Sequence, residues 1–197
     1  MKRNVMFLIV LVAISLCAGA AMAQQGLVIK TLAEKKVAEL PAGPLFWRIE
    51  NFATLTQARA AAGLMGLAAE AGGKVWLFTL GSAGGSSPGG TKVAEFGPLP
   101  PVVATEYLLR INETTGVPGS MTPVHTHPGS EAFYVLAGEQ TQRTPRGATR
   151  LGVGQYMVGH GADTPMQVSS SGSTDLHMLV MFVVDATKPF SSPAKFP

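Results

Sequence analysis

The sequence predicts an all-β protein, a barrel or sandwich of short strands. Runs of β-branched and aromatic residues recur between turn residues along the chain, and only one run is typical of a helix. Glycine and proline number 23 and 14 of 197 residues, and only 14% of the residues are charged, a composition typical of many short strands and turns. The length predicts a single domain.

Residues 1–23 predict a cleaved signal peptide. Two basic residues precede an apolar run over residues 5–20, and residues 21–23 (Ala-Met-Ala) form a small-x-small cleavage motif. The apolar run is short for a membrane span of about 20 residues, which disfavours an uncleaved anchor. We expect no stable membrane span after cleavage. We therefore expect a periplasmic or secreted protein that begins at Gln24.

The chain without this segment has no cysteine and little net charge. The sole cysteine, Cys17, leaves with the signal, which excludes disulfides and thiolate chemistry. Two of the 15 Lys and Arg residues also leave, so 13 remain against 12 Asp and Glu, a net charge of +1. No basic cluster remains, and we expect no nucleic-acid partner.

We expect residues 24–100 to form an N-terminal extension with additional strands and one short helix. Residues 24–40 mix apolar residues with Lys and Glu, which fits an arm or a short helix. The one clear helix is expected over residues 54–62, after Thr54 as N-cap and before Gly63. Strands are expected at 45–50, 74–80 and 93–96, and a flexible glycine-rich loop at 81–90.

The alternation of apolar and polar residues becomes regular after residue 105. Strands this frequent, without intervening helices, favour an all-β barrel or sandwich over a parallel sheet. The expected strands are 106–112, 124–127, 131–137, 139–144, 148–151, 155–158, 166–169 and 175–184.

Two histidines and one carboxylate suggest a metal site in this second half. His125 and His127 lie one residue apart on an expected strand, so both imidazoles point to the same face. Glu131 follows across a Pro-Gly turn and can return beside them. Two nitrogens and one oxygen suit one borderline divalent ion, Fe, Mn, Ni, Cu or Zn, whose identity the pattern leaves open.

The segment from Gly119 to Gly138 resembles the first signature of the cupin family. That signature is G-x5-H-x-H-x3,4-E-x6-G, and every fixed position is met here without an insertion. The resemblance covers about residues 105–185 and implies an antiparallel cupin, or jelly-roll, β-barrel over residues 101–190 with a metal inside. It also admits a homodimer paired through strand edges.

The second signature of the family is incomplete in this chain. Met166 stands where cupins usually have a third histidine ligand. Met166 could act as a soft thioether ligand, His160 could supply the missing imidazole, or the site could keep only three ligands with open positions. A site without metal is the fourth account. We favour three ligands, because methionine more often fills a core than binds metal.

Further side chains are candidates for the walls of the barrel cavity. Phe133 and Val135 share the face of Glu131 and are expected to line it. Tyr107 and Arg110 fall on opposite faces of their strand, so at most one points inward, and an inward Arg110 could orient an anionic substrate. His177 is expected to be a packed or edge histidine.

The resemblance implies a protein that binds or transforms a small molecule. Open metal positions in an apolar cup suit an oxygenase, for example a quercetinase-like one, or an isomerase, although no single residue is assigned a catalytic role. The alternative is a non-catalytic periplasmic cupin that binds a small molecule or a metal. A closed four-ligand shell would favour the alternative.

Overall fold

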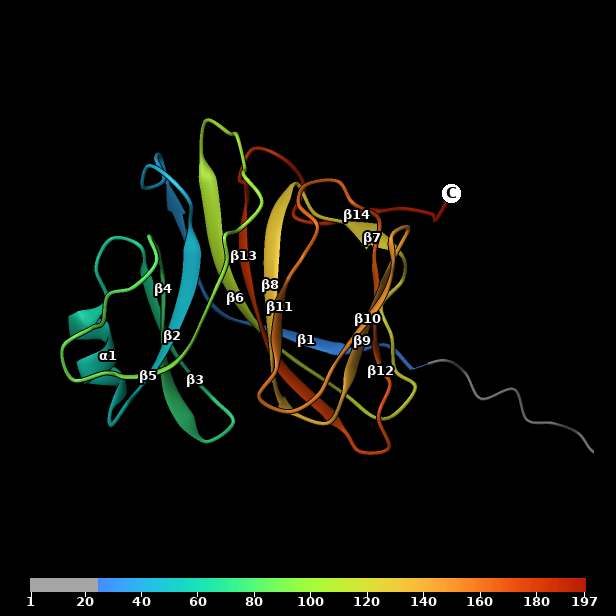
Figure 1. Cartoon of the computed structure of the whole chain (residues 1–197), viewed down its shortest axis with the longest axis horizontal. Helices are drawn as coiled ribbons and strands as arrows, with labels where there is room; N and C mark the ends of the chain where they lie inside the picture. Colours follow the sequence, from blue (N-terminus) through green and yellow to red (C-terminus); the bar gives the residue numbers. More distant parts are fainter. Residues whose placement is uncertain (1–24) are drawn as a thin grey trace, which may run out of the picture.

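The computed structural model describes residues 25–197, and the predicted signal peptide lies outside them. These residues form three packed β-sheet layers with one short helix outside them (Figure 1). All strand pairs within the sheets are antiparallel. The predicted class, an all-β antiparallel cupin-type fold with an extension containing a short helix, is confirmed. None of the helices in residues 25–197 is long and apolar enough to cross a membrane.

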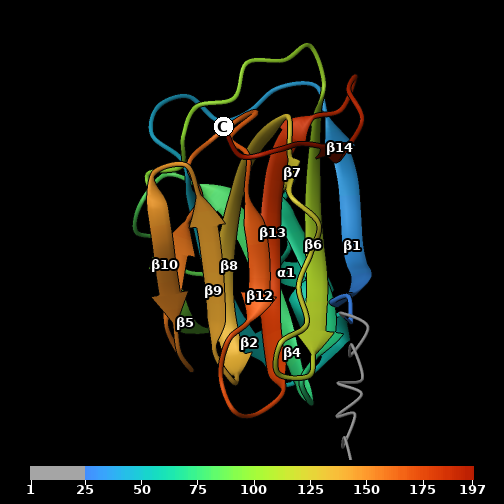
Figure 2. The same cartoon turned by 90° about the vertical axis from the view of Figure 1, so that its right-hand side faces the viewer.

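The central layer is a five-stranded sheet with the order β1–β6–β13–β8–β11 (Figure 2). In that order, its strands are Val28–Val37, Tyr107–Gly116, Leu176–Asp185, Gly129–Ala137 and Tyr156–Val158. Both faces of this sheet are covered, and nine of the ten residues of β13 are buried. The long apolar run predicted at 175–184 is therefore a strand that packs on both sides.

A smaller layer covers the inner face of the central sheet. It contains a three-stranded sheet with the order β10–β9–β12, from strands Gly147–Leu151, Gln140–Thr144 and Gln167–Ser170. Beside it, β7 (His125–Thr126) pairs with β14 (Ser192–Pro193). An apolar cluster joins the layers, and it includes Phe133, Val135, Leu151, Val168, Met178, Val180 and Phe182.

A four-stranded sheet covers the outer face of the central sheet. Its order is β3–β4–β2–β5, from strands Gly66–Ala71, Lys74–Gly81, Phe46–Phe52 and Thr91–Phe96. One continuous core joins the two sheets and includes Trp47, Ile49, Trp76, Phe78, Leu109, Ile111, Leu179, Met181 and Val183. The helix α1 (Leu55–Ala61) packs on the far side, and Thr54 accepts a hydrogen bond from the Gln57 amide at 3.2 Å, as predicted for its N-cap.

Two strands of the extension differ from the sequence-based expectation. Residues 28–37 are not an arm or a short helix but β1, paired along β6 in the central sheet. A register shift between Thr31 and Ala33 changes which side chains face inward, and this hides the alternation in the sequence. The strand β3 is rich in alanine, which strand propensity disfavours, and its pairing with β4 overrides that preference.

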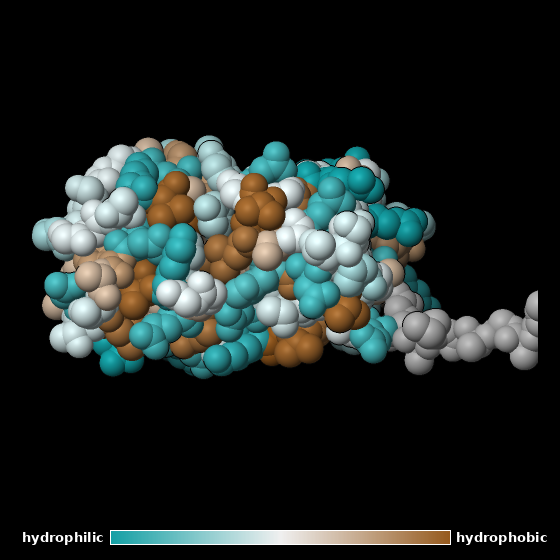
Figure 3. Space-filling view, turned by 90° about the horizontal axis from the view of Figure 1, so that it is seen from below, coloured by the Kyte–Doolittle hydropathy of each residue, from teal (hydrophilic) through white to brown (hydrophobic). Residues whose placement is uncertain are grey.

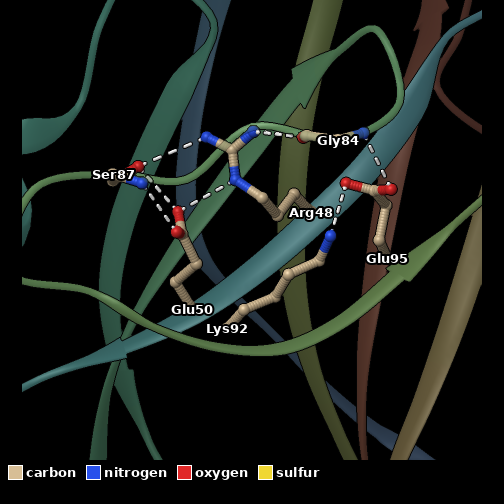
Figure 4. A network of polar contacts seen from close by, with 6 residues as sticks. All are labelled: Arg48, Glu50, Gly84, Ser87, Lys92 and Glu95. Atoms are coloured by element: carbon tan, nitrogen blue, oxygen red, sulfur yellow. Dashed lines mark hydrogen bonds and ion pairs between the residues drawn. The ribbon is translucent and has the colours of Figure 1, made fainter.

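The loop at 81–90, expected to be flexible, is anchored by charged side chains (Figure 4). Glu50 is fully buried and accepts hydrogen bonds from the Ser87 amide at 2.8 Å and the Ser87 hydroxyl at 2.6 Å. Arg48 pairs with Glu50 at 3.1 Å and donates to the Gly84 carbonyl, while Glu95 accepts from the Gly84 amide. The glycines of this loop therefore reflect its turns rather than flexibility.

The surface is mixed rather than uniformly polar. Figure 3 shows apolar residues as scattered patches among polar ones on the face seen from below. In the described part of the chain, the large exposed apolar residues are Val28, Ile29, Leu64, Val103, Val117, Val153 and Tyr156.

Candidate functional site

The motif spans β7 and β8: His125 lies on β7, His127 in the connection that follows it, and Glu131 on β8 at the inner face of the central sheet. Its first and last glycines have left-handed backbones, with φ of 86° at Gly119 and 72° at Gly138. A Cβ atom at Gly138 would also lie 2.5 Å from the Asp175 carbonyl oxygen. These two glycines therefore suit the turn that precedes the histidines and the turn that follows β8.

Both histidines are oriented by backbone carbonyl groups. His125 Nδ1 lies 2.8 Å from the Pro123 oxygen, and His127 Nδ1 lies 2.6 Å from the Phe190 oxygen. Because a carbonyl oxygen only accepts hydrogen bonds, each Nδ1 carries a proton, and the lone pair available for a metal is then the one on Nε2. Metal-binding histidines are commonly held in this way. The two rings are 5.0 Å apart between centroids.

Glu131 is buried beside His127. Its Oε2 is 3.9 Å from His127 Nε2, too far for a hydrogen bond, and its Oε1 accepts from Gln142 Nε2 at 2.7 Å. Burial raises the pKa of Glu131 to about 8, although the hydrogen bond from Gln142 acts to lower it. The carboxyl group is therefore mostly protonated at pH 7 unless a cation lies against it.

The charge state of His127 is also set by burial. Desolvation lowers its pKa to about 4; the hydrogen bond to Phe190 opposes this, and the charges of His125 and Arg110 add to it. His127 is therefore neutral at pH 7. The 3.9 Å contact with Glu131 is then a contact of two neutral groups rather than an ion pair.

Met166 lies opposite His125, at the position where the resemblance leads one to expect a histidine. The two residues exchange backbone hydrogen bonds of 2.9 and 2.8 Å, and Met166 is 2% exposed. Its sulfur lies 3.5 Å from Gln142 Nε2, the same amide nitrogen that donates to Glu131. Gln142 therefore connects Met166 with Glu131.

Sequence reasoning did not find Gln142. Its strand β9 has polar residues at Gln140, Gln142 and Thr144, a pattern expected to face water, yet all three are buried against the barrel interior. The sequence alone indicates little of this, because glutamines at alternate positions of a strand are typical of the solvent-exposed face of a hairpin.

His160 and His177 do not join the site. The His160 loop runs beside the motif strand through backbone contacts, from the Gly159 amide to the Glu131 carbonyl and from the Asp163 amide to the His127 carbonyl. The residues that line the cavity, however, do not include His160. His177 points to the outer face of the sheet and contacts Glu113 at 2.8 Å.

A cavity of about 570 Å³ adjoins the motif between the two layers. It is lined by inward residues of the central sheet, by both motif histidines and by residues of the C-terminal segment 186–194. The lining includes Ile29, Thr31, Arg110, Asn112, Thr114, His125, His127, Glu131, Phe133, Val180, Phe182 and Phe190. The walls are largely apolar, as is usual for small-molecule sites.

The predicted wall residues divide between the two faces of the central sheet. Phe133 lines the cavity, and Val135 is fully buried in the adjoining inner core. Arg110 is the inward residue of its strand. Tyr107 instead lies on the outer face beside Leu99 and Val183, because it is an odd number of residues from Arg110 and successive side chains alternate.

The donor set fits a divalent metal in chemistry but is not assembled into a closed site. Two imidazole Nε2 atoms and one carboxylate suit a borderline ion. Within residues 25–197, however, no three His, Cys, Asp or Glu side chains converge closely enough to hold a metal ion as they stand. Binding would require the side chains to move together around the ion.

The topology and the position of the motif together describe one fold. Antiparallel layers enclose a cavity, and the histidine motif lies on its wall, which is the arrangement of the cupin fold. No family model and no curated protein sequence matches the chain.

Several solved structures resemble part of the chain. A cupin superfamily protein from Desulfitobacterium hafniense is 16% identical, with 39% of this chain and 68% of that chain covered and a TM-score of 0.36. A cupin-like protein from Thermotoga maritima is 17% identical over 45% and 65%, with a TM-score of 0.39. A DMSP lyase from Ruegeria pomeroyi is 20% identical over 44% and 43%, with a TM-score of 0.37. These partial overlaps concern the fold alone.

Proposed function

We propose that the protein binds a small molecule in the cupin cavity beside a divalent metal held by His125, His127 and Glu131. The observation that carries this proposal is the pair of carbonyl contacts at the two Nδ1 atoms, which leave both Nε2 atoms available on the cavity wall. A metal bound there with open positions would supply Lewis-acid chemistry or activate water or dioxygen.

The surrounding residues keep His127 in the neutral form that binds metals and orient the Glu131 carboxyl group. His127 is already neutral, so no proton has to leave it. Gln142 holds one oxygen of Glu131 and leaves the other directed to the His127 side. The rings of Phe182 and Phe190 pack on His127 at centroid distances of 4.9 and 4.8 Å and keep water from that side of the imidazole.

A non-catalytic binding protein is the second candidate. One observation favours it: Met166 stands where the family's second signature has its histidine. In this account the cavity holds its ligand without transforming it. If a bound small molecule is converted when metal is present and is not converted after the metal is removed, the protein is an enzyme.

Zinc binding by equilibrium dialysis tests the proposed ligand set. We expect His127→Ala and Glu131→Ala to lose the ion, because each removes one of three ligands. Met166→Ala should keep most of the affinity, and His177→Ala, which removes a histidine from the outer face, is the matched control. Equal loss in Met166→Ala and His127→Ala would contradict the three-ligand account.

We also propose that the protein is exported and acts in the periplasm or outside the cell. The basic residues, apolar run and Ala-Met-Ala motif of residues 1–23 support this. An intact mass that corresponds to a chain beginning at Gln24 is the expected result, and a mature protein that retains residues 1–23 would refute it. The predicted homodimer stays a prediction.

A further inference from the structure

The inward face of the central sheet places one cation in line with the motif. The strands β1, β6, β13 and β8 lie side by side (Figure 2). Their register puts Glu34, Arg110, Phe182 and Glu131 in one row across them. Two strand spacings separate Arg110 from Glu131, roughly 10 Å between their Cα atoms. The Phe182 side chain lies between them on the cavity wall.

The Arg110 side chain has capacity for another partner. Its Nε and Nη2 atoms both lie 2.7 Å from one oxygen, Oε2 of Glu34. In residues 25–197, Nη1 makes no hydrogen bond. The Glu34 side chain is 47% exposed, so solvent weakens this ion pair. The guanidinium also lies 4.0 Å over the ring of Phe190, the residue whose carbonyl orients His127.

A second polar residue lies in the next row of the same wall. Asn112 is two positions from Arg110 on β6, lines the same cavity, and is 4% exposed. Its Oδ1 has no hydrogen-bond partner within the described part of the chain. A buried amide without a partner is costly, and a ligand group can supply the missing bond. Asn112 therefore points independently to a polar group in the ligand.

Apart from several hydroxyl side chains, the remaining wall is apolar and aromatic. Phe133, Val180, Phe182 and Phe190 surround the space between the two polar rows and the motif. The one carboxyl group that lines the cavity, Glu131, is bound to Gln142 on the far side of Phe182. The cavity thus has a largely apolar space for the body of a ligand, and at one side the Arg110 guanidinium and the Asn112 amide can bind its polar groups.

We propose that the natural ligand is a small, mostly apolar organic acid whose carboxylate binds Arg110 and whose polar edge binds Asn112. The body of the acid packs on the phenylalanine rings and reaches toward His125, His127 and Glu131. The inference rests on the proposed function for the location of the ligand, but the acid anchor does not depend on a metal.

A matched acid and amide test this anchor. Binding of cinnamate and of its neutral amide, cinnamamide, is measured by isothermal titration calorimetry on the mature wild-type protein, with and without zinc. We expect cinnamate to bind more tightly than cinnamamide, by roughly 10- to 100-fold, because a charge-assisted hydrogen bond distinguishes them. Equal affinities, or no binding of either probe, would overturn the proposal.

Variants separate recognition from support of the fold. Arg110→Met keeps the aliphatic stem and should remove the preference for the acid. Glu34→Gln breaks the same ion pair but leaves the arginine, so it should keep or increase that preference. If Glu34→Gln loses cinnamate as strongly as Arg110→Met, the ion pair is only structural and the proposal fails. Asn112→Leu should weaken the binding of cinnamamide, whose N–H groups can donate to Asn112 Oδ1, more than that of cinnamate, whose carboxylate only accepts hydrogen bonds.

The zinc arm distinguishes this inference from the proposed metal site. Acid preference that depends on Arg110 in the absence of zinc binding would support the anchor and refute the metal. Zinc bound through His127, with equal affinity for acid and amide, would support the metal and refute the anchor.

Discussion

At the scale of single residues, the cupin motif predicted which side chains share the cavity wall. His125, His127 and Glu131 were separable from other candidates by spacing alone, because alternation and a short turn determine their faces. Gln142 and Asn112 were not, because an isolated amide in a strand has no distinctive spacing. Their roles depend on contacts across sheets, such as the 2.7 Å hydrogen bond from Gln142 to Glu131.

Gln142 should tune the metal site without being a ligand. We expect Gln142→Leu to lower zinc affinity by about 10- to 100-fold, because partners that orient a ligating group commonly contribute that much. Gln140→Leu is the matched control, since Gln140 is equally buried on the same strand but contacts Met157 at 4.0 Å instead. Calorimetric zinc titration of both variants checks this, and equal losses would argue against a specific role.

At the scale of elements, the later strands were predictable and two early ones were not. The apolar run of Leu176–Asp185 predicts its strand. In contrast, β1 is an edge strand with a register shift and exposed positions, so its sequence has no regular strand pattern. The loop at 81–90 has the composition of a flexible linker. Its order comes from Arg48, Glu50 and Glu95, which lie outside the loop in sequence.

The buried Glu50 should make stability depend on pH. Burial alone would raise its pKa, but hydrogen bonds from Ser87 and the pairing with Arg48 together hold the pKa below 4.5. A lowered folded pKa means that stabilisation is complete above the ordinary value of the carboxyl group and is lost as the pH falls through the folded value.

We expect Glu50→Gln to lower the free energy of unfolding at pH 7 by about 2 to 4 kcal/mol, because Arg48 loses its buried anionic partner. The loss should shrink on acidification below pH 4.5, the ordinary pKa of this group. Urea unfolding across this range measures it. Glu70→Gln, an exposed change in the same sheet system, is the control and should be near neutral. A pH-independent difference would contradict the assigned pKa direction.

At the scale of the whole molecule, the extension and the barrel share one core. Trp76 and Phe78 from the outer sheet pack with Ile111 and Met181 from the central sheet. The sequence predicted strands in both regions, but not that one sheet would cover the other, because these contacts join residues far apart in the chain. The outer sheet therefore covers one face of the central sheet, and the smaller layer and the cavity lie against the other.

This shared core predicts cooperative unfolding. We expect Phe78→Ala to lower the free energy of unfolding by about 3 to 5 kcal/mol, because Phe78 is fully buried between the sheets. Tryptophan fluorescence, which reports on the outer sheet, and far-ultraviolet circular dichroism should show coincident transitions. Separate transitions would mean that residues 24–100 and 101–190 unfold as independent units.

The metal content of the mature protein tests the central claim most directly. The protein is purified from its native compartment without chelator, beside His125→Ala and His177→Ala, and analysed for transition metals. The account predicts close to one Fe, Mn, Ni, Cu or Zn ion per chain in the wild type and in His177→Ala, and loss of the ion in His125→Ala. A metal-free wild-type protein, or metal retained by His125→Ala, would contradict it.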